Sequence, residues 1–290
     1  LTKEEEAEVA QEAWEAKRKE IDNYCSHKAI EAVMAKGTKW NVMTGKWVLT
    51  WKWSEKGWKI KARLVLRGFQ DRQGSNLHRY SPTATRVGQR LLLVTAVMYS
   101  WPCVSFDISA AFLQGMPLEK VTTQEGKARA VWCRPPSDVW VLLREIKAKY
   151  GLELPAIGFE SHWLWRLLKA AYGLDDAPLL WRKELAEFLI EHGWVESHFD
   201  RCMFYKREGG RKTGRLIGQL TLHIDDEGVT GEQWVIDELA SQLSGRFGEL
   251  KTQIEQFRHI GHEYIQEWHD DGSTTITDGQ EFYTSTIQPV

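Results

Sequence analysis

Residues 220–231, LTLHIDDEGVTG, decide the fold, because they describe a strand that reaches a tight turn and then returns. Apolar Leu220, Leu222 and Ile224 alternate with polar residues, and this period of two predicts a strand whose apolar side chains face a core. The polar set, which includes His223 and Asp225, therefore points the other way. We expect the turn at residues 226–228, which places carboxylates at a hairpin tip.

A second strand that carries a carboxylate is predicted at residues 103–108, CVSFDI. Its apolar residues alternate with Cys103, Ser105 and Asp107, so the Asp107 carboxylate lies on the face opposite the apolar set. Two other acidic doublets, at residues 175–176 and 270–271, lie in turn-like segments and do not end apolar strands. Strand context therefore singles out Asp107 and the doublet at residues 225–226.

A basic β-hairpin is predicted upstream, with strands at residues 47–53 and 58–66 around a turn at 54–57. One face of its second strand is apolar, and the other carries the cations Lys59, Lys61, Arg63 and Arg67. Edge strands also carry lysines that discourage aggregation, so this pattern fits either a structural edge or a binding face.

Further periodic segments predict helices at residues 3–22, 86–101, 163–172, 178–192 and 232–246, and strands at 129–134 and 257–266. We expect the first helix to be an exposed arm and the helix at 86–101 to be buried. These segments do not alternate as regular βαβ units, so the fold class is α+β.

The composition, with 42% hydrophobic and 27% charged residues, is typical of a soluble globular protein. A length of 290 residues suggests about two domains. The net charge of −2 conceals −4 over residues 1–35, +11 over 36–90 and −9 over 91–290. Such asymmetry is typical of a polyanion-binding surface beside a carboxylate site, although a solvated basic face is the alternative. The four scattered cysteines predict neither a disulfide framework nor a zinc site, and no apolar stretch is long enough to cross a membrane.

Asp107, Asp225 and Asp226 form a carboxylate set that needs cations, because like charges brought together repel one another. Mg²⁺ prefers oxygen ligands, and two such ions could activate an attacking hydroxyl and stabilise a leaving pyrophosphate; Mn²⁺ is an alternative ion. The sequence thus predicts in-line phosphoryl transfer. A metal-dependent phosphohydrolase would use the same carboxylates but leaves the basic hairpin without a role.

Seven motifs in this order resemble the reverse transcriptases of copia-type retrotransposons, over roughly residues 14 to 288. They are KARLVLRGFQ (61–70), RYSPT (79–83), FDISAAFLQG (106–115), RPP (134–136), KAAYGLDDAPLLW (169–181), LHIDDEGVTG (222–231) and FRHIGHEY (257–264). The resemblance implies RNA-directed DNA polymerase activity.

The resemblance also implies a right-hand polymerase fold, with an antiparallel palm sheet that has helices on one face, a fingers lobe with a β-hairpin, and an incomplete thumb. The implied parts are an N-terminal helical arm (1–35), fingers (36–102), the first palm motif (103–118), an insertion (119–165), palm (166–250), and a primer-grip hairpin with the start of the thumb (251–290).

The site residues that the resemblance implies fall into three groups. Asp107, Asp225 and Asp226 would be catalytic, and they would bind metal together with Ile108. The nucleotide would contact Lys61, Arg63, Phe112, Tyr172 and Gly173, where Phe112 excludes a ribose 2′-hydroxyl and the choice between Lys61 and Arg63 for the triphosphate stays open. The primer would contact Phe257 and Gly261. Lys251 is either a solvated lysine or the acid that protonates pyrophosphate.

The implied partners are an RNA template, a DNA or RNA primer, deoxynucleoside triphosphates, and the downstream RNase H and upstream integrase segments of one polyprotein. The first residue, Leu1, suits an excerpt of such a polyprotein, and the expected location is a cytoplasmic particle or the nucleus. His223 replaces the usual Tyr, and Asp175 and Asp176 replace Lys-Gln beside the nucleotide. These departures keep open a second reading, an inactive relic that only binds nucleic acid.

Overall fold

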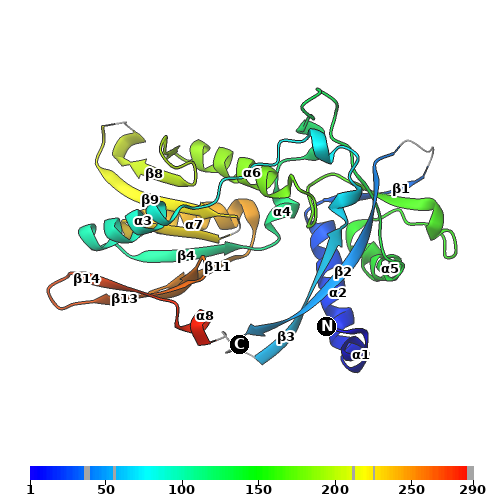
Figure 1. Ribbon diagram of the computed structural model, residues 1–290, viewed down its shortest axis with the longest axis horizontal. Helices are drawn as coiled ribbons and strands as arrows, with labels where there is room; N and C mark the ends of the chain where they lie inside the picture. The colour runs from blue at the N-terminus through cyan, green and yellow to red at the C-terminus, as the bar shows by residue number, and fades with distance from the viewer. Residues whose placement is uncertain (36–39, 55–56, 211–212, 225, 286–290) are drawn as a thin grey trace. The chain divides into compact units, whose positions relative to one another are not determined.

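The computed structural model describes all residues except 36–39, 55–56, 211–212, 225 and 286–290. The chain divides into two compact units, the first of residues 1–80 and 112–184 and the second of residues 81–111 and 185–290. Figure 1 labels the elements of both. The finer division into arm, fingers, palm and thumb stays a prediction.

The first unit is built on a five-stranded sheet in the order β1-β6-β5-β2-β3. Neighbouring strands are antiparallel except β2 and β5, which are parallel. The strands are β1 (Ile30–Met34), β2 (Val42–Ser54), β3 (Gly57–Leu66), β5 (Trp132–Arg134) and β6 (Trp163–Leu167). The helices are α1 (Lys3–Glu8), α2 (Ala10–Ser26), α4 (Ala111–Gln114) and α5 (Asp138–Tyr150), and α6 (Ala177–Glu191) continues into the second unit.

The second unit contains a six-stranded antiparallel sheet in the order β11-β4-β10-β9-β8-β7 and a three-stranded sheet, β12-β13-β14. The strands of the larger sheet are β4 (Cys103–Ile108), β7 (Trp194–Glu196), β8 (Met203–Arg207), β9 (Leu216–His223), β10 (Asp226–Gly231) and β11 (Leu250–Ile254). The smaller sheet has β12 (Gln256–His259), β13 (His262–Trp268) and β14 (Thr274–Gly279). The helices are α3 (Arg86–Tyr99), α7 (Gln233–Phe247) and α8 (Glu281–Ser285).

These mainly antiparallel sheets and separate helices confirm the predicted α+β class, and the pairing of β2 with β3 confirms the predicted hairpin. The hairpin alternates as expected, because Ala62, Leu64 and Leu66 are buried while Lys61 and Arg63 are only partly covered. None of the helices in the described ranges combines the length and the apolar character that a bilayer crossing requires.

The structure departs from several expectations about individual elements, and the single strand predicted at residues 257–266 is the two strands β12 and β13. The helix predicted at residues 3–22 is two helices that break at Val9, and α2 is no free arm, because Tyr24 is buried and donates a hydrogen bond to the Leu64 carbonyl of β3 (2.9 Å). Residues 163–167 form strand β6 instead of a helix. Leu164 and Trp165 are both buried, and a strand covered on both faces gives a continuous apolar run that resembles a buried helix.

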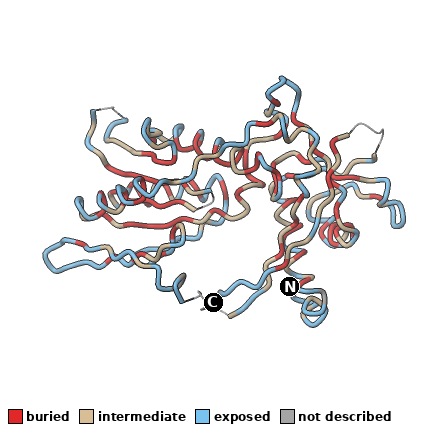
Figure 2. Tube along the Cα trace, in the orientation of Figure 1, coloured by how far each residue is buried: buried red, intermediate tan, exposed pale blue. Residues whose placement is uncertain are grey.

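Helix α3 was expected to be buried, but it is buried on one side only, where Leu92 and Ala96 pack with Phe257 and Tyr264 of the smaller sheet. The opposite side of α3 exposes Val87, Leu91, Val94 and Met98. Figure 2 shows exposed and buried segments alternating along this helix.

The larger sheet has helices on both faces instead of the one that was expected. A side-chain carbon added at Gly228 would meet Leu92 of α3 at 3.2 Å, and one at Gly218 would meet Val235 of α7 at 3.0 Å. Because Gly228 lies opposite Thr221, and residues 218 and 221 point to opposite faces, α3 and α7 lie on opposite sides. Both faces of β9 are therefore covered, and Thr221 is as buried as Leu220.

Candidate active site

Four polar side chains form one row across the larger sheet of the second unit. Lys251 of β11 is opposite Asp107 of β4, Asp107 is opposite Asp226 of β10, and Asp226 is opposite His223 of β9. Residues directly opposite one another on antiparallel strands share a face, with their β-carbons about 5 Å apart. The sheet therefore brings together Asp107 and Asp226, which are far apart in sequence.

The Asp107 carboxylate forms an ion pair with Lys251, whose Nζ lies 2.8 Å from Oδ2. Both side chains are partly exposed, so the pair is open to solvent. Lys251 thus has a defined partner instead of being simply solvated, and that partner is a carboxylate predicted to bind metal. Among the described residues, no three His, Cys, Asp or Glu side chains are grouped so that they could hold a metal ion.

The turn between β9 and β10 has an unusual backbone. Ile224 adopts a left-handed conformation (φ 60°), which is sterically costly for a β-branched residue and is often found at functional sites. Ile224 is also 37% exposed, so the expectation that it faces the core was wrong. Strand β9 ends at His223, and residues 226–228, which were expected to form the turn, already belong to β10. Asp225 lies outside the described residues.

Asp107 and Asp226, the two described carboxylates of this row, form what is called the carboxylate row below. Their donor atoms suit a divalent cation. Asp107 and Asp226 supply hard oxygen ligands on one face of adjacent strands, and Ile108, which follows Asp107 on β4, offers a backbone carbonyl. Lys251 already balances one carboxylate, as expected for a site whose negative charge needs a cation.

Three of the residues predicted to bind nucleotide meet in the first unit. The rings of Phe112 and Tyr172 contact edge to face with centroids 5.1 Å apart, and the Arg63 guanidinium lies 5.3 Å from the centre of the Tyr172 ring. Such a cation–π contact orients the guanidinium while leaving its charge in place. Lys61 lies on the same face of β3, two residues before Arg63.

The segment that carries Tyr172 is packed tightly against the end of β3. The amide of Leu66 donates to the Tyr172 carbonyl (2.8 Å), and Gly173 follows with a φ of 94°. A side-chain carbon at Gly173 would lie 2.0 Å from the Leu66 carbonyl oxygen, a distance that no atom can occupy. Gly173 is therefore required for this close approach of two backbones.

The two acidic residues that depart from the resemblance both have cationic partners within the first unit. Asp176 is buried, and its Oδ2 accepts from Nε of Arg129 at 2.9 Å. Arg129 also pairs with Asp71, whose Oδ2 lies 2.6 Å from Nη2. Asp175 pairs on the surface with Arg79 at 3.1 Å. The negative charges of Asp175 and Asp176 are thus compensated by arginines.

The two residues predicted to contact the primer differ in exposure. Phe257 is buried and packs against Tyr264, with ring centroids 5.2 Å apart. Gly261 lies in the turn between β12 and β13 with a φ of 79°, and nothing lies within 4 Å of a side-chain carbon added there. The hairpin thus has a packed base and an open tip.

Sequence reasoning missed two residues that organise these sites. The partners of Arg129 are 47 and 58 residues away along the chain, so no local spacing could signal them. Buried His259 was also missed as a titrating group. Its ring nitrogens have no hydrogen-bond partner in the described part of the chain, and burial, aided by nearby His223, lowers its pKa to about 4.

Comparison with known proteins identifies the family. Residues 32–152 match the family model described as reverse transcriptase (RNA-dependent DNA polymerase). The retrovirus-related Pol polyproteins from transposons RE2 and RE1 of Arabidopsis thaliana are 30% and 28% identical over 206 residues, which is 70% of this chain. The Pol polyprotein from transposon TNT 1-94 of Nicotiana tabacum is 24% identical over 65% of this chain.

These matches define the class as a reverse transcriptase domain. More particularly, they support a reverse transcriptase domain of a copia-type retrotransposon polyprotein. The chain spans 12% of the length of these three polyproteins.

Solved structures give weaker similarity. A foamy viral protease–reverse transcriptase in complex with double-stranded DNA aligns over 93% of this chain and 36% of its own, with a TM-score of 0.43 and 11% identity. Apo telomerase from Candida tropicalis aligns over 87% of this chain and 50% of its own, with a TM-score of 0.42 and 9% identity.

Proposed function

We propose that this chain catalyses template-directed DNA synthesis on an RNA or DNA template, as the reverse transcriptase part of a retrotransposon polyprotein. The observation that carries the proposal is the cross-strand pairing of Asp107 with Asp226 on one face of the sheet. Family membership supports the same activity.

In this proposal Asp107, Asp225 and Asp226 hold two Mg²⁺ ions, with the Ile108 carbonyl as a further ligand and Mn²⁺ as an alternative ion. The bound ions would neutralise phosphate charge and favour ionisation of the attacking primer hydroxyl. Lys251, held 2.8 Å from Asp107, is placed to give a proton to the departing pyrophosphate.

The residues of the first unit would bind the incoming deoxynucleoside triphosphate. The contact between Arg63 and Tyr172 favours Arg63 over Lys61 as the group that meets the triphosphate, because the ring fixes the guanidinium in place. Phe112, braced by Tyr172, would exclude a ribose 2′-hydroxyl, and Gly173 would keep the segment close to β3. Gly261 at the hairpin tip would contact the primer, while buried Phe257 would hold the hairpin rigid.

The proposed partners are an RNA template, a DNA or RNA primer and deoxynucleoside triphosphates, together with RNase H and integrase segments of the same polyprotein. The proposed location is a cytoplasmic retrotransposon particle or the nucleus. Neither Asp175 nor Asp176 argues for an inactive relic, since both carry arginine partners; His223 remains the departure that favours it.

The direct test is primer extension by the purified chain on a poly(rA) template with an oligo(dT) primer. We expect incorporation of deoxythymidine that requires Mg²⁺ and stops when EDTA is added. Salt-sensitive binding of the primed template without any incorporation, with either Mg²⁺ or Mn²⁺, would instead support the relic.

A further inference from the structure

A cavity of about 440 Å³ lies in the first unit, among β1, β5, β6 and the segment around residue 118. Its apolar lining includes Leu118, Val131 and Leu167, each of which is at least 97% buried. This volume falls in the range of pockets that bind small organic ligands. All of its lining residues belong to the first unit, whereas the carboxylate row belongs to the second.

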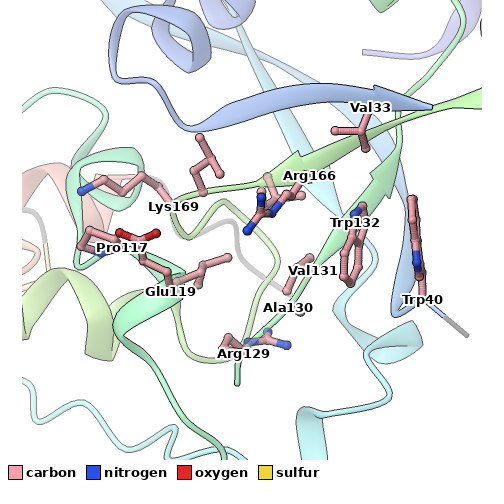
Figure 3. A pocket seen from close by; sticks show the side chains of 13 residues that line it. Val33, Trp40, Pro117, Glu119, Arg129, Ala130, Val131, Trp132, Arg166 and Lys169 are labelled. Carbon is pink, nitrogen blue, oxygen red and sulfur yellow. The ribbon is translucent and has the colours of Figure 1, made fainter. Parts of the chain in front are cut away.

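One wall of the cavity is aromatic. The rings of Trp40 and Trp132 are stacked, with centroids 4.9 Å apart and planes 19° from parallel. Figure 3 shows Trp40 beside Trp132 on the side away from Arg166, Glu119 and Lys169. An indole held flat in this way offers a stacking surface to another planar ring.

Charged side chains also line this cavity. Arg166 is half exposed and forms a long ion pair with Glu31, at 3.6 Å. Lys169 donates to the Gly115 carbonyl at 2.8 Å, and Glu119 adds a carboxylate on the same side of Figure 3 as Lys169. Arg129 also lines the cavity, but its charge is held by Asp71 and Asp176.

An aromatic wall, an apolar floor, cations and a carboxylate together match the chemistry of a nucleotide. The planar base would stack on Trp132, Glu119 could accept from an exocyclic amino group, and Arg166 could pair with the phosphate. We propose that this cavity binds an unpaired nucleobase together with its phosphate, separately from the carboxylate row. The ligand is a free nucleotide or one nucleotide of a single strand, which share this chemistry.

The first experiment is photocrosslinking of the full chain to a single-stranded ten-nucleotide RNA that carries one 5-iodouridine, with the crosslinked residue located by mass spectrometry. We expect the crosslink at Trp132 or Trp40. Crosslinks that map only outside the cavity would overturn the proposal.

The second experiment measures the affinity of the same RNA by fluorescence anisotropy. Arg166→Glu and Trp132→Ala should each weaken binding about tenfold, the loss expected for one stacking or ionic contact. Lys147→Glu, the same charge reversal at an exposed position of α5, and Trp53→Ala, at an exposed tryptophan of β2, serve as matched controls. Because Trp132→Ala could disturb folding, the exposed variant Arg166→Glu decides the matter. Equal affinity of Arg166→Glu and the parent chain would contradict the proposal.

Competition separates the two sources of the ligand. Guanosine monophosphate that displaces the RNA and abolishes the crosslink identifies a free nucleotide as sufficient, whereas a persistent crosslink assigns the site to a strand. The crosslinking and anisotropy measurements contain neither Mg²⁺ nor deoxynucleotide, so they report RNA binding without primer extension. The site therefore survives failure of the proposed polymerase activity, and the two proposals can fail separately.

Discussion

Asp176 and Arg129 form a buried ion pair, with the Asp176 Oδ2 atom 2.9 Å from Nε of an arginine that solvent does not reach. Arg129 reaches Asp71 with its other nitrogens, so one guanidinium ties residue 176 to the segment after β3. This arrangement explains how an aspartate can replace the usual polar residue there without placing an unpaired charge in the pocket.

We predict that Arg129→Met destabilises the chain by about 3 to 5 kcal/mol, because it leaves two carboxylates buried without a counter-charge. Asp175→Asn, which breaks the neighbouring surface pair with Arg79, should cost less than about 1 kcal/mol. Urea denaturation of both variants measures the difference. Similar losses at the two positions would show that burial of the Arg129 cluster has no special role.

Lys251 is predicted to compete with Mg²⁺ for Asp107, because both cations are drawn to the same carboxylate. Lys251→Met should therefore lower the Mg²⁺ concentration for half-maximal binding by roughly threefold, a modest change because the pair is exposed to solvent. Isothermal titration with Mg²⁺ measures it, with Arg258→Met as a control that removes a cation paired to Glu263 elsewhere in the second unit. Weaker Mg²⁺ binding by Lys251→Met would contradict this account.

His259 is predicted to make the fold sensitive to acid. Burial lowers its pKa to about 4 in the folded chain, while the unfolded chain has an ordinary value near 6.5. As the pH falls from about 6.5 towards 4, His259 therefore binds a proton in the unfolded state but not in the folded state. The free energy of unfolding decreases as a result. Between pH 7 and pH 5 the loss attributable to His259 should be about 2 kcal/mol.

Urea unfolding of the parent chain and His259→Leu at both pH values tests this. The variant should lose about 2 kcal/mol less than the parent on acidification, although other titrating groups act on both. His269→Leu, at an exposed histidine of the same unit, should behave like the parent. If His259→Leu and the parent lose equal stability, His259 is not the group responsible.

Phe112 is predicted to select deoxynucleotides. Phe112→Val should raise incorporation of ribonucleotides relative to deoxynucleotides by roughly 100-fold, since a smaller side chain leaves room for a 2′-hydroxyl. Phe112→Tyr keeps the ring against Tyr172 and should keep the selection. Single-nucleotide extension assays with dTTP and UTP compare the three proteins, and unchanged selection in Phe112→Val would remove Phe112 from this role.

Sequence patterns predicted the elements that depend on local backbone geometry, and they missed the contacts that residues far apart in the sequence make. Alternation located β4, β9 and the basic hairpin, because it reflects local geometry. It failed at residues 163–167, since a strand covered on both faces loses its polar alternation. Two strands with carboxylates predicted that Asp107 and the doublet at residues 225–226 meet, but the direct pairing of Asp107 with Asp226 was not predicted, because Asp226 was expected in a turn. The place of Lys251 depends on strand order, and the Arg129 cluster depends on tertiary packing.

The central claim, that Asp107 and Asp226 act together in nucleotidyl transfer, is tested most directly by primer extension with Asp107→Asn and Asp226→Asn beside Asp237→Asn. Asp237 is an exposed residue of α7, which makes it a matched control in the same unit. We predict that each of the first two changes lowers the rate of extension at least about 1,000-fold while circular dichroism and primed-template binding stay the same, and that the control retains the parent rate. Extension at the parent rate by folded Asp226→Asn would contradict the account.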